Sequence, residues 1–354
     1  MEKLKLKARN KMKGPIICLG EIMLRLSPPQ PERLFQSPFL DTTFGGGEAN
    51  TAASLAQFDC DVSLVTALPA NPIGDACIRF LRGFGVDSSR IQRSGDRIGI
   101  YYLESGANQR PTQVVYDRTH SALAVADPAS FNWDEIFEGA SWLHVTGITP
   151  AISQSAADLT LEAVKVASQK GIMISVDTSH RAKLWQYGVA PQEIMPKIAH
   201  YTHVLFANLH DCSFSYGIDL DPADKVGQDE STLNQMIGAK MFEAFPNLKY
   251  QVFTHREGFS ASHNAWAASV YDGQQTFRST RYDITNIVDR VGGGDAFAAG
   301  LIYGFYHEMG IQAALDFGAA AACLKHSVPG DVNLATVAEV EQLMAGDSSG
   351  RVQR

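Results

Sequence analysis

The sequence predicts an α/β fold, a three-layer α/β/α sandwich with a mostly parallel central sheet. From about residue 15, short apolar segments bounded by turn residues alternate with segments of helical periodicity. Apolar strands of this kind fit a sheet that helices cover on both faces. The chain has 354 residues, of which 45% are hydrophobic and 19% charged, so it can bury a large core.

The alternation assigns the elements in chain order. Strands are expected at residues 16–23, 62–67, 142–146, 172–177, 203–207 and 251–254. Helices are expected at residues 48–58, 153–169 and 232–245. The regular exchange of strand and helix is the pattern of a parallel sheet.

Two segments, at about residues 24–44 and 98–120, interrupt this pattern. The first contains Pro28, Pro29 and Pro31 close together, and the second alternates apolar and polar residues, as in GIYYLES and TQVVYDR. Such alternation is typical of strands with one wet face, so we expect a small antiparallel sheet beside the main one. That sheet can form a lid that excludes water from a site, although surface hairpins without a role fit the pattern equally well.

Composition and charge exclude several functional classes. The net charge of −8 argues against a general nucleic-acid binder, which normally carries a basic patch. The five cysteines are far apart and form no CxxC pair, which indicates reduced thiols rather than disulfides or a zinc site. The basic N-terminal segment lacks the apolar core of a secretory signal, and no apolar stretch is long enough to span a bilayer. We therefore expect a cytoplasmic protein with no membrane partner.

A glycine-rich segment carries the clearest chemical signal. Gly292, Gly293 and Gly294 follow an apolar run, and Asp295 opens an apolar helix. Successive glycines let backbone N–H groups approach a ligand, and the positive end of a helix favours an anion there. A carboxylate at this position can accept the proton of a hydroxyl that attacks a phosphoryl group. On the pattern alone, simple helix capping by Asp295 explains the segment equally well.

Two motifs together resemble the ribokinase-like (pfkB) carbohydrate kinases. VDRVGGGDAFAAG (residues 288–300) is similar to the second signature of that family, and FGGGEANTAASLAQF (residues 44–58) resembles the first. The resemblance implies a ribokinase-like fold with a single kinase domain over residues 1–345, followed by a tail at 346–354. It also implies Asp295 as the catalytic base and Gly292–Gly294 as an anion hole. Arg290 replaces the usual small residue, which leaves the cation-binding details of this segment, including a monovalent cation, open.

Further local matches resemble the 2-keto-3-deoxygluconate kinases of this family. They include GEIMLRLSPP (20–29), YDRTHSA (116–122), VTGITPA (145–151) and DTSHRAKLW (177–185). The resemblance implies that the sugar acid contacts Gly46, Tyr101, Tyr116, Arg118 and Arg181. Arginine suits this role because its guanidinium group binds a carboxylate in a bidentate manner.

Arg25 stands where ribokinase-type members carry an aspartate for neutral sugars, which also fits an anionic substrate. Ser179 departs from the asparagine that is usual in the 2-keto-3-deoxygluconate kinases. For each arginine taken singly, a solvated surface charge is the simpler explanation.

The resemblance also implies positions for a nucleotide and a metal ion. Asn208 and Asp211 match an Asn-x-x-Glu segment that organises Mg²⁺ indirectly, through water. Thr254 and Arg256 match positions near the phosphates of ATP, to which Gly292 and Gly294 also contribute. The segment 325–327 is expected near the adenine, with no contact assigned.

The leading hypothesis is ATP-dependent phosphorylation of a sugar acid, most directly 2-keto-3-deoxygluconate to its 6-phosphate. A fructokinase or ribokinase is the alternative within the same class. A non-catalytic sugar-acid sensor is an alternative of another class. A nicotinamide oxidoreductase is disfavoured, because no glycine fingerprint follows the first strand. An exposed lid face would suit a homodimer or a larger homo-oligomer.

Overall fold

The computed structural model describes residues 13–181 and 183–346. Within these residues, a ten-stranded sheet has the order β13-β12-β11-β10-β9-β8-β1-β4-β5, with β14 paired to β12. Its strands are β1 Ile16–Leu19, β4 Val62–Leu68, β5 Ile91–Arg93, β8 Trp142–Thr146, β9 Met173–Asp177, β10 Val204–Phe206, β11 Tyr250–Ser260, β12 His263–Tyr271, β13 Thr276–Arg278 and β14 Tyr282–Thr285. Pairing is parallel from β5 to β11 and antiparallel around β12, so the predicted mostly parallel sheet is confirmed.

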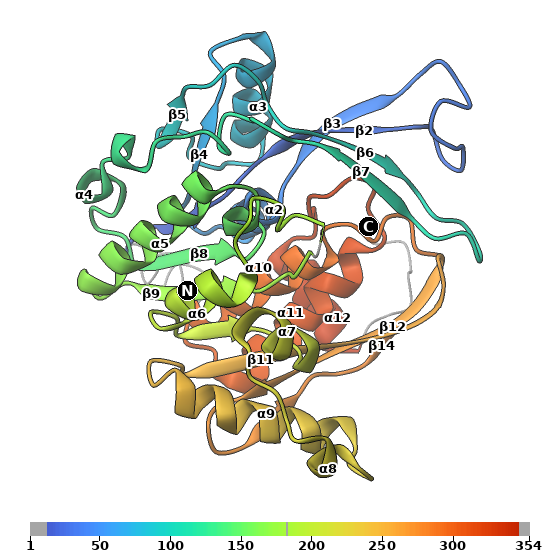
Figure 1. Cartoon of the computed structure of the whole chain (residues 1–354). Coiled ribbons are helices and arrows are strands. Elements are labelled where there is room, and N and C mark those ends of the chain that lie inside the picture. Colours follow the sequence, from blue (N-terminus) through green and yellow to red (C-terminus); the bar gives the residue numbers. More distant parts are fainter. Residues whose placement is uncertain (1–12, 182, 347–354) are drawn as a thin grey trace, which may run out of the picture.

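Helices cover both faces of this sheet (Figure 1). They are α2 Gly47–Gln57, α3 Pro72–Gly83, α4 Trp133–Ile136, α5 Gln154–Gln169, α6 Pro191–Ala199, α7 Leu209–Tyr216, α8 Pro222–Lys225, α9 Glu230–Ala244, α10 Gly293–Tyr306, α11 Ile311–Lys325 and α12 Val337–Met344. One hydrophobic cluster joins the sheet to α2, α10 and α11, and a second joins it to α5, α6 and α9. In β1, Ile16 and Cys18 belong to the first cluster, whereas Ile17 and Leu19 belong to the second, as a strand buried on both faces requires.

The helices α10 and α11 pack unusually closely. A Cβ atom added to Gly300 would lie 2.7 Å from the Gly318 Cα atom, and one added to Gly304 would lie 2.5 Å from the Ala314 Cα atom. Small residues on both helices therefore let the two backbones approach each other. This packing fixes the direction in which the N-terminus of α10 points.

Two predicted strands differ in extent from those observed. The segment 16–23 does not form one strand, because β1 ends at Leu19 and β2 begins at Met23. At the break, Gly20 lies against the Glu48 carboxyl group, where an added Cβ would be 2.0 Å from Cδ. The strand predicted at 251–254 continues to Ser260, because its second half pairs with β12 in an antiparallel hairpin.

A separate four-stranded sheet contains both of the predicted lid segments. It has the order β3-β2-β6-β7, with β2 Met23–Ser27, β3 Asp41–Gly45, β6 Ile100–Glu104 and β7 Gln113–Asp117. This small sheet projects from the molecule at the upper right of Figure 1. The prediction of an antiparallel sheet was wrong in one respect, since β2 and β6 pair in parallel. They come from two separate hairpin-like units that meet along these central strands.

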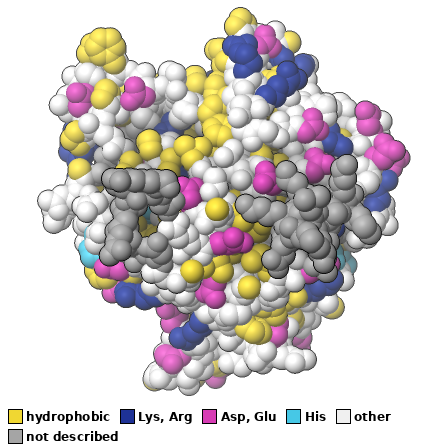
Figure 2. All heavy atoms as spheres, turned by 180° about the vertical axis from the view of Figure 1, so that it is seen from behind, with side chains coloured by type: hydrophobic (Ala, Val, Ile, Leu, Met, Phe, Trp, Pro, Cys, Tyr) yellow, Lys and Arg dark blue, Asp and Glu magenta, His cyan; other side chains and the backbone are white. Residues whose placement is uncertain are grey.

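The surface of the described residues mixes charged and apolar side chains. Figure 2 shows acidic and basic side chains interspersed on one face, with hydrophobic side chains in the hollow between two projections at the top. In and beside the small sheet, Phe35 and Phe39 are each 72% exposed, and β7 is exposed along its whole length. Every helix within residues 13–181 and 183–346 is too short or too polar to cross a bilayer. The predicted tail at 346–354 lies outside the described residues except for Gly346.

Candidate active site

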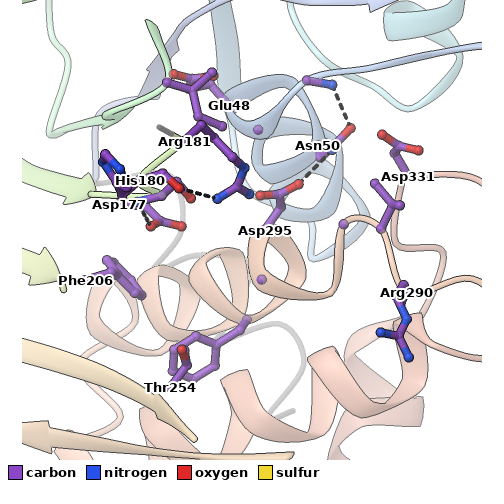
Figure 3. A pocket seen from close by; sticks show the side chains of 18 of the residues that line it. Glu48, Asn50, Asp177, His180, Arg181, Phe206, Thr254, Arg290, Asp295 and Asp331 are labelled. Atoms are coloured by element: carbon purple, nitrogen blue, oxygen red, sulfur yellow. Dashed lines mark hydrogen bonds between the residues drawn. The ribbon is translucent and has the colours of Figure 1, made fainter. Parts of the chain in front are cut away.

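A cavity of about 700 Å³ lies at the carboxyl ends of the parallel strands and beside the small sheet (Figure 3). Open α/β sheets bind their ligands at this edge. All predicted site residues except Gly293 line it, namely Gly46, Tyr101, Tyr116, Arg118, Arg181, Asn208, Asp211, Thr254, Arg256, Gly292, Gly294 and Asp295. Because β6 and β7 supply part of the wall, the small sheet contributes to the site, and the alternative of hairpins without a role is disfavoured.

The glycine turn, residues 292–294, leads into α10. Gly292 has a φ of 81°, and a Cβ added to it would lie 1.8 Å from the Asp331 carbonyl oxygen, so only glycine fits. Gly293 is buried against the His326 ring, whereas a Cβ added to Gly294 would meet no atom within 4 Å. The first turn of a helix presents N–H groups and the positive end of the helix dipole. The turn can therefore accommodate an anion beside Gly294.

Asp295 is the third residue of α10 and is held by a neighbouring helix. The Asn50 side-chain amide donates to Asp295 Oδ2 at 2.7 Å (Figure 3). Burial raises the pKa of Asp295 to about 7, an effect that the hydrogen bond from Asn50 opposes and the negative charge of Asp177 increases. A carboxyl group with this pKa can accept a proton near neutral pH and release it again.

Glu48 anchors the first turn of α2 to the sheet. Its Oε1 atom accepts hydrogen bonds from the Thr146 N–H at 3.0 Å, the Thr146 hydroxyl at 2.8 Å and the Thr149 hydroxyl at 2.8 Å. Burial raises the pKa of Glu48, and these hydrogen bonds oppose that shift. The carboxyl group of Glu48 therefore joins α2, which carries Asn50, to the end of β8.

The predicted substrate arginine Arg118 is already part of an ion pair. Its guanidinium donates to Glu21, which also accepts a hydrogen bond from the Ser121 hydroxyl, and both charged side chains are buried. The Tyr116 ring lies 5.4 Å from Arg118 Cζ, a cation–π distance. Arg118 Nε is buried and lacks a hydrogen-bond partner among the described residues. The charge of Arg118 is thus largely balanced by the protein itself.

Three other arginines line the same cavity without a carboxylate partner among the described residues. They are Arg181, Arg256 and Arg290. Arg181 donates to the His180 carbonyl at 3.0 Å, and Arg290 donates to the carbonyls of Ser260 and Ala261. Although Arg256 is exposed, desolvation by the surrounding protein and the charges of Arg290 and Arg181 lower its pKa. An anion in the cavity would balance these charges.

Asn208, Asp211 and Asp177 meet where β9 and β10 end. Asp211 Oδ2 accepts a hydrogen bond from the Asn208 N–H at 3.0 Å. Asn208 Oδ1 accepts from the Thr254 N–H at 3.0 Å, and Asn208 Nδ2 donates to the Thr254 hydroxyl at 3.3 Å. Burial raises the pKa of both carboxyl groups, that of Asp177 to about 6, and the charge of Asp211 adds to the shift of Asp177.

These carboxyl groups fit a hydrated magnesium ion. Mg²⁺ prefers oxygen ligands, keeps several waters and binds through one or two carboxylates plus substrate phosphates. Within the described chain, no group of three or more His, Cys, Asp or Glu side chains forms a dedicated metal cage. Asp177 and Asp211 would hold the ion, whereas the Asn208 side chain is hydrogen-bonded to Thr254.

Several lining residues were not predicted as site residues. Glu48 and Asn50 lie in the first glycine motif, so their position in that motif was the available signal. Asp177 ends a predicted strand, and Arg290 lies within the second signature, where it replaces the usual small residue. Lys325 does not line the cavity, although its segment was expected near the adenine.

Comparisons with known proteins agree with this geometry. The sequence profile of the "pfkB family carbohydrate kinase" group matches residues 14–242 and 257–337. The crystal structure of 2-dehydro-3-deoxygluconokinase from Thermotoga maritima is 42% identical, with a TM-score of 0.87, and covers 94% of this chain and 99% of that one.

Two further relatives are similar along nearly their whole length. The 2-dehydro-3-deoxygalactonokinase of Haloferax volcanii is 31% identical over 342 residues, which is 96% of this chain and 99% of that protein. The 2-dehydro-3-deoxygluconokinase of Bacillus subtilis is 26% identical over 326 residues, which is 91% of this chain and 92% of that protein. The named substrates of all three proteins are keto-deoxy sugar acids.

Proposed function

This chain belongs to the pfkB family of carbohydrate kinases, and on that premise we propose that it phosphorylates a 2-keto-3-deoxy sugar acid with ATP. The proposed reaction converts 2-keto-3-deoxygluconate to its 6-phosphate. The observation that carries the proposal is the position of the partly buried Asp295 carboxyl group, which lies at the head of α10 beside the glycine turn and accepts a hydrogen bond from Asn50. The names of relatives at 42% and 31% identity support a sugar-acid acceptor.

Asp295 acts as the general base in this proposal. It accepts the proton of the acceptor hydroxyl as that oxygen forms a bond to the γ-phosphorus of ATP. The bond from the γ-phosphorus to the bridging oxygen breaks, and ADP leaves with the electron pair. Asn50 holds the base in place through its 2.7 Å hydrogen bond.

The glycine turn and the arginines stabilise the charge of the transferring group. Backbone N–H groups at Gly292–Gly294, together with the dipole of α10, form the proposed anion hole. Thr254 and Arg256 line the cavity and are proposed to lie near the nucleotide phosphates, and Arg290 adds a further positive charge to the same cavity. Magnesium, when bound near Asp177 and Asp211, supplies a positive charge that neutralises the phosphates.

Arg181 is the proposed partner of the substrate carboxylate. It has no carboxylate partner among the described residues, whereas Arg118 is paired with Glu21. Tyr101, Tyr116 and Gly46 also line the cavity and are proposed to contact the sugar acid, and Arg118 supports Tyr116 through the cation–π contact. Arg118 contacts the sugar acid only with donors that Glu21 leaves free.

The test is an ADP-release assay with ATP, Mg²⁺ and a panel of acceptors. The panel contains 2-keto-3-deoxygluconate, 2-keto-3-deoxygalactonate, fructose and ribose. We expect kcat/KM at least a hundredfold higher for a keto-deoxy acid than for either neutral sugar. Preferential turnover of fructose or ribose would favour the fructokinase or ribokinase alternative. Binding of a keto-deoxy acid without ADP formation would instead identify a sugar-acid sensor.

We also propose the state in which the protein works. Residues 1–345 form one kinase domain, in agreement with a family match that spans 14–337 with a short gap. The protein acts in the cytoplasm as a homodimer or larger homo-oligomer, and the exposed apolar residues of the small sheet support pairing there. Sedimentation analysis tests the oligomer, and a monomer at all concentrations would refute it.

A further inference from the structure

Four buried charges lie together behind the glycine turn. Lys325, at the end of α11, is 0% exposed, and Arg25, Asp289 and Asp331 are 4–5% exposed. Arg25, on β2, donates to Asp289 Oδ2 at 2.7 Å and also to Asp331. Asp289 precedes the turn, and Asp331 follows α11. The cluster therefore contains two positive and two negative side chains from three separate segments.

Lys325 binds main-chain carbonyl groups rather than the two carboxylates. Its Nζ atom donates to the Asp289 carbonyl at 3.2 Å and to the Val328 carbonyl at 3.1 Å. Burial lowers the pKa of Lys325, while the nearby Asp289 and Asp331 oppose that shift and favour the charged ammonium. A cation held between carbonyl oxygens of two loops is chemically the arrangement that a bound monovalent ion would make.

The two loops joined by Lys325 control the position of the turn. Asp289 Oδ1 accepts the Val291 N–H at 3.0 Å, and Asp289 Oδ2 accepts the Gly330 N–H at 3.2 Å. The Asp331 carbonyl lies so close to Gly292 that an added Cβ would be 1.8 Å from it. A displacement of either loop would therefore move the donors that line the cavity.

A free monovalent cation does not fit this arrangement. The Asp289 and Val328 carbonyls already accept from an ammonium group, and Arg290 donates to the carbonyls of Ser260 and Ala261 on the other side of the signature. A second cation between the same oxygens would be repelled by Lys325 and Arg25, because like charges in a desolvated site interact strongly.

We propose that Lys325 is a positioning residue whose tethered ammonium takes the place of a monovalent cation behind the anion hole. Phosphoryl transfer by this protein then needs no potassium or sodium. The proposal rests on the kinase function described above and adds a statement about what holds the Gly292–Gly294 donors in place.

The first experiment measures turnover of the full chain without alkali cations. Rates are compared in potassium, sodium and tetramethylammonium chloride of equal ionic strength, with the tetramethylammonium salt of ATP and saturating Mg²⁺. Equal rates within twofold are expected. A stimulation of fivefold or more by potassium would overturn the proposal while leaving the kinase function intact. Absence of turnover with every acceptor would instead count against the kinase function.

The second experiment removes the ammonium group. Lys325→Ala should lower kcat at least tenfold in tetramethylammonium chloride. Ammonium or potassium chloride should then raise the kcat of this variant several-fold. Lys165→Ala, in the exposed middle of α5, is the matched control and should show no cation response. A loss in Lys325→Ala that no small cation restores would contradict the proposal.

A third measurement does not depend on activity. Lys325→Ser leaves space for an ion beside the Asp289 and Val328 carbonyls and serves if the alanine variant does not fold. Its melting temperature should rise by several degrees when potassium replaces tetramethylammonium, whereas the wild-type temperature should not respond. Equal cation responses of the wild type and Lys325→Ser would overturn the proposal.

Discussion

At the residue scale, burial of the Asp295 carboxyl group makes the stability of the fold depend on pH. Its pKa is about 7 in the folded chain, against an ordinary value of 3.8. Because the folded chain favours the protonated carboxyl group, the group contributes to the free energy of unfolding. This contribution is fully present below pH 3.8 and is lost as the pH rises to about 7.

Asp295→Asn removes this dependence and can keep the contact with Asn50. We expect the variant to exceed the wild type in unfolding free energy at pH 8 by up to about 4 kcal/mol, a value that follows from the pKa shift. The gain should shrink towards zero near pH 4. Urea unfolding at both pH values measures it, and a variant less stable than the wild type at pH 8 would contradict the assigned pKa.

The two arginines near the substrate have different expected effects. Arg181→Ala should raise KM for the sugar acid by about 10- to 150-fold, the loss of a charge-assisted hydrogen bond, with little change in stability. Arg118→Ala leaves Glu21 buried without its partner and should cost about 3–5 kcal/mol of unfolding free energy.

The control for Arg118 is a second substitution. When Glu21→Gln is added to Arg118→Ala, the double variant should recover much of the lost unfolding free energy, because the unpaired buried charge is removed. Steady-state kinetics and urea unfolding of all variants separate the two roles. The assignment fails if Arg181→Ala leaves KM for the sugar acid unchanged.

The sequence showed site residues well where a motif is continuous and poorly where contacts are long-range. The glycine turn and Asp295 are adjacent in the chain, so one segment revealed them. The pairing of Arg118 with Glu21 joins positions 97 residues apart, and no local pattern indicates it. For the same reason the sequence interpretation treated Arg25 as a sign of an anionic substrate, whereas its partners are Asp289 and Asp331.

At the element scale, the close contact of α10 and α11 sets the position of the catalytic helix. Gly300→Ala would place a methyl group 2.7 Å from the Gly318 Cα atom, so the helices must separate. We expect a loss of about 1–3 kcal/mol in unfolding free energy, the usual range for overpacking. Urea unfolding measures the loss.

Gly83→Ala is the matched control for this prediction. Gly83 is an exposed residue at the end of α3, and an added Cβ meets nothing within 4 Å. The substitution should be neutral or stabilising by up to about 1 kcal/mol, since alanine is the better helix former. Equal effects of the two substitutions would argue against helix contact as the cause.

Elements were predicted best where their residues are apolar throughout. β8 was predicted with its observed bounds, and the helix expected at 153–169 corresponds to α5, with Ser153 as its N-cap. The exposed second half of β11 and the break between β1 and β2 were missed. Both depend on tertiary contacts, the hairpin with β12 and the approach of Glu48 to Gly20, which outweigh local periodicity.

At the scale of the whole molecule, the small sheet is connected to the chemistry by buried polar contacts. Arg25 on β2 and Tyr101 on β6 both donate to Asp331, whose carbonyl packs against the glycine turn. The sequence indicated a second sheet but could not indicate this connection, because its members come from three distant segments. The lid and the proposed anion hole therefore form one continuous structure.

The most direct measurement of the central claim is ADP formation from 2-keto-3-deoxygluconate by the wild type and by Asp295→Asn. We predict that the wild-type kcat rises with pH through about 7, as the base loses its proton. The variant should lose about 10²- to 10⁴-fold in kcat, the usual contribution of general-base catalysis, while it still binds ATP. Turnover by Asp295→Asn within threefold of the wild type would contradict the account.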